Sequence, residues 1–204
     1  MSPEIKAADV KALRERTGAA MMDCKAALTE AGGDLEKAIE VLRVKGQASA
    51  AKRSGRSTGE GVVTSYVHAT GRIGALVEIQ CETDFVARND DFKAFAADIA
   101  LHIAAAAPRY VSAADVPADE EAAERAVFEQ KAAEDGKPEN VRERIVEGQL
   151  AKWRKEIALL EQPHVNSDKH EGKTIEQLRE EASAKTGENI RIARFARFEV
   201  GSED

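Results

Sequence analysis

Hydrophobic residues recur at helical spacing in three short runs at the start of the chain. The first predicted helix ends at Thr17-Gly18, because glycine readily adopts the left-handed conformation of a helix C-terminus. Asp23–Ala31 is predicted as the second helix, and Asp34 is expected to cap the third. The apolar stripe of the third helix consists of Leu35, Ala38, Ile39 and Leu42. We therefore predict a three-helix module over residues 1–46, whose small core suits docking better than catalysis.

A change of composition after this module indicates a linker. Residues 47–60 contain Gly, Ala, Ser, Lys and Arg but no large hydrophobic residue, so we predict a flexible basic linker. From Gly61 the side-chain pattern changes to a period of two, which predicts an antiparallel hairpin that turns at His68–Gly71 and returns to Cys81. A helix with one apolar face follows and ends at Pro108, and we expect it to cover the sheet.

The second half of the chain adds a helical hairpin and a third strand. Residues 117–162 are rich in Ala, Glu, Lys and Arg and are interrupted at Asp135–Pro138, which predicts two helices joined by a tight turn. Their expected apolar seam consists of Val127, Phe128, Val141, Ile145, Trp153, Ile157 and Leu160. Because this seam is modest and the charge is high, the hairpin should protrude or pair with something. A helix from Thr174 to Gly187 and a strand over Ile190–Val200 complete an α+β core over residues 61–204, with a small antiparallel sheet of about three strands packed by helices.

Composition limits the partners and the compartment. The 204 residues, 43% of them hydrophobic, suffice for one ordinary domain and a small one. A net charge of −7 argues against sequence-independent nucleic-acid binding, which needs a basic surface. No apolar run approaches the roughly 20 residues that span a bilayer, and no signal-peptide core is present. We therefore expect no membrane association, a cytoplasmic location and reduced thiols at Cys24 and Cys81.

One segment places an acid and an aromatic residue side by side where the second strand ends and a helix begins. Thr83 is predicted to cap a short helical turn, and Asp84 lies at the positive end of that turn. Phe85 has no obvious neighbour to pair with at strand or helix spacing. Two interpretations stay open: Phe85 closes the corner as a core residue, or it projects toward another molecule.

The sequence offers little support for an enzyme. It contains no nucleophile elbow, phosphate-binding glycine loop or metal-ligand spacing, so we predict no catalytic residue, no bound metal and no cofactor. Asp90-Asp91 begins a helix, where carboxylates belong for capping and dipole reasons. His102, beside Ile103 on the predicted helix, is interpreted as a structural histidine.

Two segments resemble the signatures of the elongation factor Ts family. The first is Val10–Leu28, which reads VKALRERTGAAMMDCKAAL, and the second is Thr83–Ala87, which reads TDFVA. The similarity continues along nearly the whole chain, at His68, Arg72–Gly74, Val146–Gly148, Gln162-Pro163 and Arg197–Gly201. The resemblance implies a ubiquitin-associated-like N-terminal module, a linker and a core of antiparallel sheet packed by helices.

The resemblance also implies a function, namely guanine-nucleotide exchange on elongation factor Tu in its GDP-bound and nucleotide-free forms. In the family, the motif that matches Thr83, Asp84, Phe85 and Val86 enters a cleft beside the partner's Mg²⁺ and phosphate site. The other contacts that it implies are made by Arg14, Met21, Met22 and His68. Such a protein is a nucleotide exchange factor and catalyses no covalent chemistry.

The core of this chain differs from that of longer relatives in one respect. In longer members the core contains two related subdomains, whereas here the Asp-Phe corner and the histidine hairpin each occur once. We therefore hypothesise a homodimer that completes the contact surface. Two alternatives remain: an adaptor that only tethers a partner, and an RNA-binding factor that uses Lys52, Arg53 and Arg56.

Overall fold

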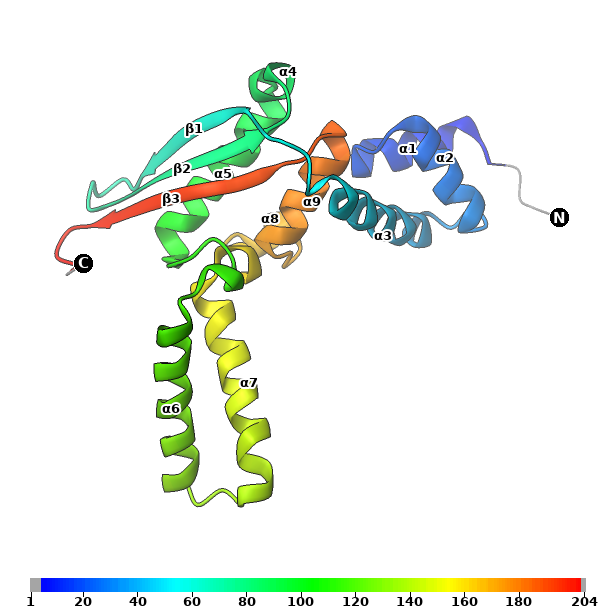
Figure 1. Cartoon of the computed structure of the whole chain (residues 1–204). Helices are drawn as coiled ribbons and strands as arrows, with labels where there is room; N and C mark the ends of the chain where they lie inside the picture. Colours follow the sequence, from blue (N-terminus) through cyan, green and yellow to red (C-terminus); the bar gives the residue numbers. More distant parts are fainter. Residues whose placement is uncertain (1–4, 203–204) are drawn as a thin grey trace. The chain divides into compact units, whose positions relative to one another are not determined.

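The computed structural model describes residues 5–202 and contains both helices and a sheet (Figure 1). The main elements are α1 (Ala7–Thr17), α2 (Met21–Glu30), α3 (Leu35–Arg53), β1 (Glu60–Val67), β2 (Ile73–Cys81), α4 (Asp84–Arg88), α5 (Asp90–Ala106), α6 (Ala118–Glu134), α7 (Glu139–Ile157), α8 (Ser167–His170), α9 (Ile175–Thr186) and β3 (Arg191–Glu199). Two short 3₁₀ turns occupy Ala113–Asp115 and Leu159–Glu161. The predicted α+β class is confirmed.

The chain forms two compact units. Within the described residues, the first unit comprises residues 5–62, together with Ile79–Phe95 and Gln177–Arg191. The second comprises Val63–Glu78, Ala96–Glu176 and residues 192–202. Helices α1 to α4 and most of α9 therefore belong to the first unit. The division that the sequence predicts, into residues 1–46, 47–60 and 61–204, stays a prediction.

The end of α1 and the start of α3 lie where their local signals predict, whereas α2 begins two residues before the predicted Asp23 and ends one residue before the predicted Ala31. Gly18 adopts φ 67° after α1, and its N–H donates to the carbonyl of Arg14 at 2.7 Å. Asp34 caps α3 by accepting a hydrogen bond from the N–H of Lys37 at 3.0 Å. The core of the module consists of Val10, Leu13, Cys24, Ala27, Leu28 and Ala38, with Leu35, Ile39 and Leu42 packed against it.

Helix α3 is longer than the sequence pattern predicts. It continues to Arg53, so the first half of the predicted flexible linker over residues 47–60 is helical. Alanine, glutamine, lysine and arginine in this stretch are strong helix formers, and Ala50 is buried. Serine and glycine, which predict a flexible chain, outnumber the strong helix formers only after Arg53.

The three strands form one sheet in the order β1-β2-β3. Its register follows from two hydrogen bonds, His68 N–H to Ile73 O at 2.8 Å and Val200 N–H to Arg72 O at 2.9 Å. In the second unit one face buries Ala75 and Val77 of β2, and Arg197 Nε of β3 donates to the carbonyl of Ala104 in α5 at 3.0 Å. The opposite face exposes Val63, Val67, Leu76 and Phe198. Helix α5 therefore covers one face, as predicted, and the other face carries exposed hydrophobic side chains.

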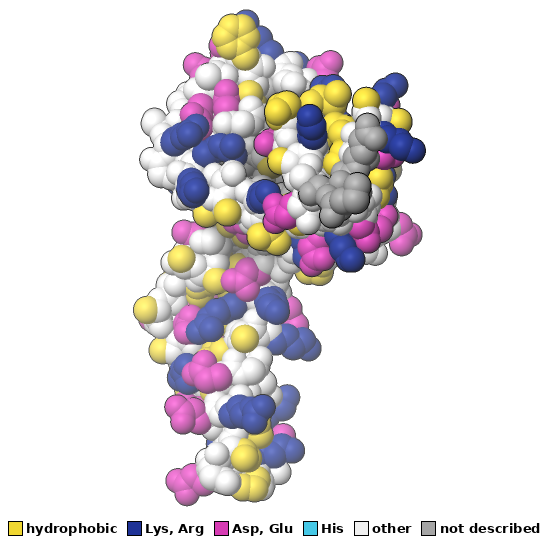
Figure 2. Space-filling view, turned by 90° about the vertical axis from the view of Figure 1, so that its right-hand side faces the viewer, with side chains coloured by type: hydrophobic (Ala, Val, Ile, Leu, Met, Phe, Trp, Pro, Cys, Tyr) yellow, Lys and Arg dark blue, Asp and Glu magenta, His cyan; other side chains and the backbone are white. Residues whose placement is uncertain are grey.

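Helices α6 and α7 form the predicted hairpin and lie side by side (Figure 1). Their contact differs from the predicted seam. The buried residues are Ala132, Val146 and Leu150, with Phe128 and Trp153 packed against them. Val127 and Val141, which the sequence analysis assigns to the seam, are exposed. Acidic and basic side chains mix over the hairpin surface (Figure 2). Among residues 5–202, every helix is too short or too polar to cross a bilayer.

Candidate functional site

The segment Thr83–Val86, called here the acidic-aromatic corner, begins helix α4 in the first unit. Thr83 has extended backbone angles, and its side chain accepts a hydrogen bond from the N–H of Val86, so it is the predicted N-cap. Asp84 lies in the first turn and forms an ion pair with Arg88 at 3.0 Å. The cap and the first turn of α4 therefore follow from residues of this segment and the helix itself.

Phe85 is 82% exposed. The buried residue of α4 is instead Ala87. The interpretation of Phe85 as a core residue that closes the corner is therefore wrong. Burial of a phenylalanine ring contributes about 1.5–3 kcal/mol, so a molecule that covers Phe85 would gain this free energy.

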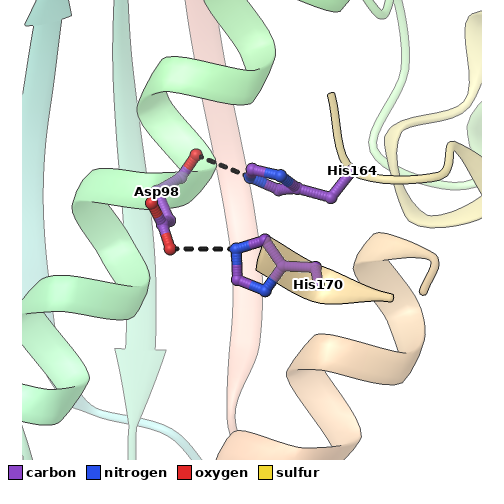
Figure 3. A group of neighbouring side chains, drawn as sticks. All are labelled: Asp98, His164 and His170. Atoms are coloured by element: carbon purple, nitrogen blue, oxygen red, sulfur yellow. Dashed lines mark hydrogen bonds and ion pairs between the residues drawn. The ribbon is translucent and has the colours of Figure 1, made fainter. Parts of the chain in front are cut away.

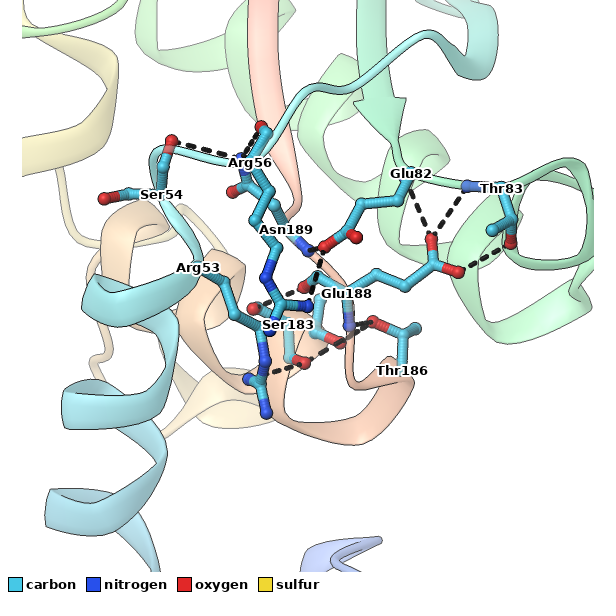
Figure 4. Close-up of polar contacts among 10 residues, drawn as sticks. Arg53, Ser54, Arg56, Glu82, Thr83, Ser183, Thr186, Glu188 and Asn189 are labelled. Carbon is cyan, nitrogen blue, oxygen red and sulfur yellow. Dashed lines mark hydrogen bonds and ion pairs between the residues drawn. The ribbon is translucent and has the colours of Figure 1, made fainter.

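The corner is hydrogen-bonded to the junction between α9 and β3 in the same unit (Figure 4). The carboxylate of Glu188 accepts from the N–H of Glu82 at 2.9 Å, the N–H of Thr83 at 3.1 Å and the hydroxyl of Thr83 at 2.6 Å. The carboxylate of Glu82 in turn accepts from the N–H of Asn189 at 2.6 Å. The sequence carries no signal for this pair of carboxylates, because Glu188 lies more than one hundred residues from Thr83 along the chain.

The segment after α3 joins the same network. The side-chain amide of Asn189 donates to the carbonyls of Ser54 at 3.2 Å and Arg56 at 2.9 Å. Arg56 forms an ion pair with Glu82 at 3.4 Å, and Arg53 donates to the carbonyl of Ser183 at 3.4 Å. Two of the three basic residues proposed for RNA binding thus have partners within the protein.

Three other predicted contact residues lie on the N-terminal helices of the first unit. Arg14, Met21 and Met22 are all exposed, and Met22 is 73% exposed. Figure 2, which faces this module, shows hydrophobic side chains at its surface. Thioether side chains adapt to irregular apolar surfaces, so these methionines suit a docking role.

His68 lies in the β1–β2 loop of the second unit and is exposed. Its Nδ1 is 3.2 Å from the hydroxyl of Tyr66. The structure therefore brings the acidic-aromatic corner into the same unit as Arg14 and the two methionines, and places His68 in the other unit.

The second unit contains a cluster that has no signal in the sequence, because Asp98 lies more than sixty residues from the two histidines along the chain. The ligand atoms of Asp98, His164 and His170 all lie within 4.8 Å of one another (Figure 3). His170 Nε2 is 3.2 Å from Asp98 Oδ2, and Lys169 also pairs with that carboxylate. Two imidazoles and a carboxylate are a ligand set that zinc accepts.

Hydrogen bonds occupy the ring nitrogens of His164, however. Its Nδ1 accepts from the N–H of Asn166 at 3.1 Å, which puts the ring proton on Nε2. This N–H then donates to the carbonyl of Asp98 at 3.3 Å. Because neither nitrogen has a free lone pair, we interpret the cluster as a polar clasp between α5 and the segment around α8.

Burial changes the pKa of His164 in this clasp and of His102, whose ring centroid is 5.2 Å from that of His164. His102 on α5 accepts from the N–H of Val165 at Nδ1 and donates from Nε2 to Gln162 at 2.9 Å. Burial lowers the pKa of His102 from 6.5 to about 4, against an opposing effect of the Gln162 hydrogen bond. Burial also lowers the pKa of His164. His102 is thus the structural histidine that the sequence predicts.

Both cysteines are buried free thiols. Cys81 donates to the carbonyl of Thr83, the first residue of the acidic-aromatic corner, at 3.2 Å. Burial, together with the negative charge of Glu188, raises the pKa of Cys81 to about 11. This thiol is therefore protonated at neutral pH and acts as a hydrogen-bond donor.

Comparison with known proteins identifies similar sequences along almost the entire chain. A family model described as elongation factor TS matches residues 6–202. Elongation factor Ts of Carboxydothermus hydrogenoformans is 58% identical over 192 residues, which cover 94% of this chain and 87% of that protein. The proteins of the same name from Geobacter metallireducens and Thermoanaerobacter pseudethanolicus are 55% and 54% identical over 197 residues, covering 97% of this chain and 90% and 95% of the relatives.

Proposed function

Because the chain belongs to the elongation factor Ts family, we propose that it is a guanine-nucleotide exchange factor for elongation factor Tu. It promotes release of GDP during translation elongation and itself catalyses no covalent chemistry. The observation that carries the proposal is the exposure of Phe85 on a hydrogen-bonded corner. This role places the protein in the cytoplasm, with the GTPase as its partner.

The proposed mechanism uses the acidic-aromatic corner as a wedge. Phe85 enters an apolar cleft between helices of the GTPase, and its burial there contributes about 1.5–3 kcal/mol toward separating them. Asp84 brings a negative charge near the ligands of the GTPase's Mg²⁺ and disturbs their orientation, which weakens metal binding. Loss of the metal removes charge neutralisation from the phosphates of GDP. The nucleotide then dissociates faster.

The remaining predicted contacts hold the two proteins together. Arg14, Met21 and Met22 dock the N-terminal module on the GTPase, and His68 presses against one of its helices. Reciprocity requires that GDP weakens binding of this factor by the same ratio by which the factor weakens binding of GDP. The factor therefore binds the nucleotide-free GTPase tightly and leaves when a new nucleotide enters.

The proposed exchange activity is tested by following release of a fluorescent GDP from elongation factor Tu with and without this protein. We expect release to become faster in proportion to the concentration of the factor until the GTPase is saturated. Binding with no change in the release rate would support the adaptor instead. Binding to RNA that weakens steeply with salt, and that neutralisation of Lys52, Arg53 and Arg56 abolishes, would support the RNA-binding alternative.

We further propose that two copies associate through the exposed face of the sheet in the second unit. Phe198 is 69% exposed there, and Val63, Val67 and Leu76 are exposed on the same face. Exposed hydrophobic patches of this kind mark interaction surfaces, and a two-fold axis lets one patch cover its own copy. Each GTPase would then contact both subunits, which completes the surface that longer relatives form with two subdomains.

Leu76→Asp is expected to convert the dimer to monomers, because two carboxylates would be buried without partners at the two-fold interface. Sedimentation velocity measures the change, and we expect the dissociation constant of the dimer to rise at least about tenfold. Val127→Asp, which alters an exposed residue of the helical hairpin, is the control and should leave the dimer intact. A wild-type protein that sediments as a monomer yet retains full exchange activity would exclude this interface.

A further inference from the structure

The acidic-aromatic corner has little hydrophobic packing to fix its direction. Helix α4 has five residues, far fewer than an isolated helix needs for stability in water. Ala87 is its buried residue, and the Phe85 ring lies in solvent. The direction in which Phe85 projects must therefore be set by polar contacts to the backbone that precedes it.

One carboxylate makes three of these contacts. Glu188 accepts from two successive backbone N–H groups, those of Glu82 and Thr83, and from the hydroxyl of Thr83. Hydrogen bonds to an ionised acceptor are about twice as strong as neutral ones. Removal of the carboxylate would leave all three donors without this acceptor at the point where β2 ends and α4 begins.

Glu188 is itself held in place from both sides. Gly187 ends α9 with φ 74°, a conformation that turns the chain out of the helix. The hydroxyl of buried Ser183 donates to the carbonyl of Glu188 at 2.6 Å, and the N–H of Glu188 donates to Thr186 Oγ1 at 3.4 Å (Figure 4). The carboxylate thus extends from a fixed backbone toward the corner.

The contact is reciprocal, since Glu82 accepts from the backbone N–H of Asn189 while Glu188 accepts from the backbone of Glu82. Asn189 is buried, and its side chain binds the carbonyls of Ser54 and Arg56. The end of β2, the start of β3 and the segment after α3 are therefore joined in one network of hydrogen bonds.

We propose that Glu188 is a positioning residue for nucleotide exchange, whose carboxylate holds the backbone of Glu82 and Thr83 so that Phe85 projects in the direction that the GTPase cleft requires. Glu188 acts through Phe85 and makes no contact with the nucleotide. This inference rests on the proposed exchange function. It predicts that the effect of removing Glu188 disappears once Phe85 has been removed.

A double-mutant cycle on the full-length chain tests this coupling. Glu188→Ala is expected to lower the rate of GDP release stimulated by the factor roughly tenfold, because three hydrogen bonds to a charged group are lost. In a Phe85→Ala background the same change should lower the stimulated rate of GDP release by less than about twofold. Glu188→Gln keeps one acceptor oxygen and should recover most of the rate.

The controls separate positioning from general loss of structure. Glu147→Ala removes a carboxylate that pairs with Arg125 in the helical hairpin, and it should leave exchange unchanged. Thermal unfolding is measured for every variant. If Glu188→Ala does not fold, Glu188→Asp serves instead, because it keeps the charge but shortens the reach and should also slow exchange.

The outcomes distinguish this inference from the proposed function. If Glu188→Ala lowers the stimulated rate of GDP release by the same factor with and without Phe85, or does not lower it, the positioning role is overturned. The wedge then stays intact. A factor that fails to accelerate GDP release, or that is unaffected by Phe85→Ala, would overturn the wedge itself. Loss of the Glu188 effect in the Phe85→Ala background, with recovery by Gln, supports the positioning role.

Discussion

Phe85→Ala is expected to lower the stimulated rate of GDP release from elongation factor Tu roughly ten- to hundredfold, while the fold stays intact. The ring is 82% exposed, so its removal creates no cavity in the protein. In the complex its burial contributes about 1.5–3 kcal/mol, and each 1.4 kcal/mol corresponds to about a tenfold change. Stopped-flow fluorescence of a labelled GDP measures the rate, and circular dichroism measures the fold.

Val127→Ala is the matched control for Phe85→Ala. Val127 is an exposed hydrophobic residue of α6, outside the proposed contact surface, and its removal should leave the rate unchanged. Phe85→Leu keeps an apolar side chain and should retain part of the activity. If Phe85→Ala stimulates release as well as the wild-type protein does, the corner is not the wedge.

Acidification is expected to destabilise the protein through His102 by about 3 kcal/mol between about pH 7 and about pH 4. The unfolded chain takes up a proton near the ordinary pKa of 6.5, whereas the folded protein resists protonation until the pKa of about 4. The contribution of His102 to the free energy of unfolding is therefore fully present above pH 6.5 and is lost as the pH falls toward 4. Protonation would also place a second donor opposite the N–H of Val165.

Urea unfolding at the two pH values measures this loss. In His102→Gln the side chain cannot titrate, so the difference in unfolding free energy between the two pH values should shrink by about 3 kcal/mol. His68→Gln alters the exposed loop histidine and should keep the wild-type difference. Because burial also lowers the pKa of His164, a smaller loss should persist in His102→Gln. An unchanged pH dependence in His102→Gln would contradict the assignment.

Local signals along the chain predicted the elements well. The left-handed glycine after α1, the Asp34 cap of α3 and the Thr83 cap of α4 each involve residues within four positions of one another. The hairpin strands and the turn between α6 and α7 also follow from periodicity and turn residues. The end of α3 was predicted too early, because Ala50 is buried by contacts that periodicity does not reveal.

By itself the sequence determined which residues form the acidic-aromatic corner, how Thr83 caps it, and that its motif is similar to one of the elongation factor Ts family. The tertiary structure decided that Phe85 faces solvent and that Glu188 holds the corner. It also decided that His164 and His170 meet Asp98 in a polar clasp, and that Val146 and Leu150 fill the hairpin seam. Caps and turns depend on residues that are close together in the sequence, whereas burial and these hydrogen bonds depend on segments that only folding brings together.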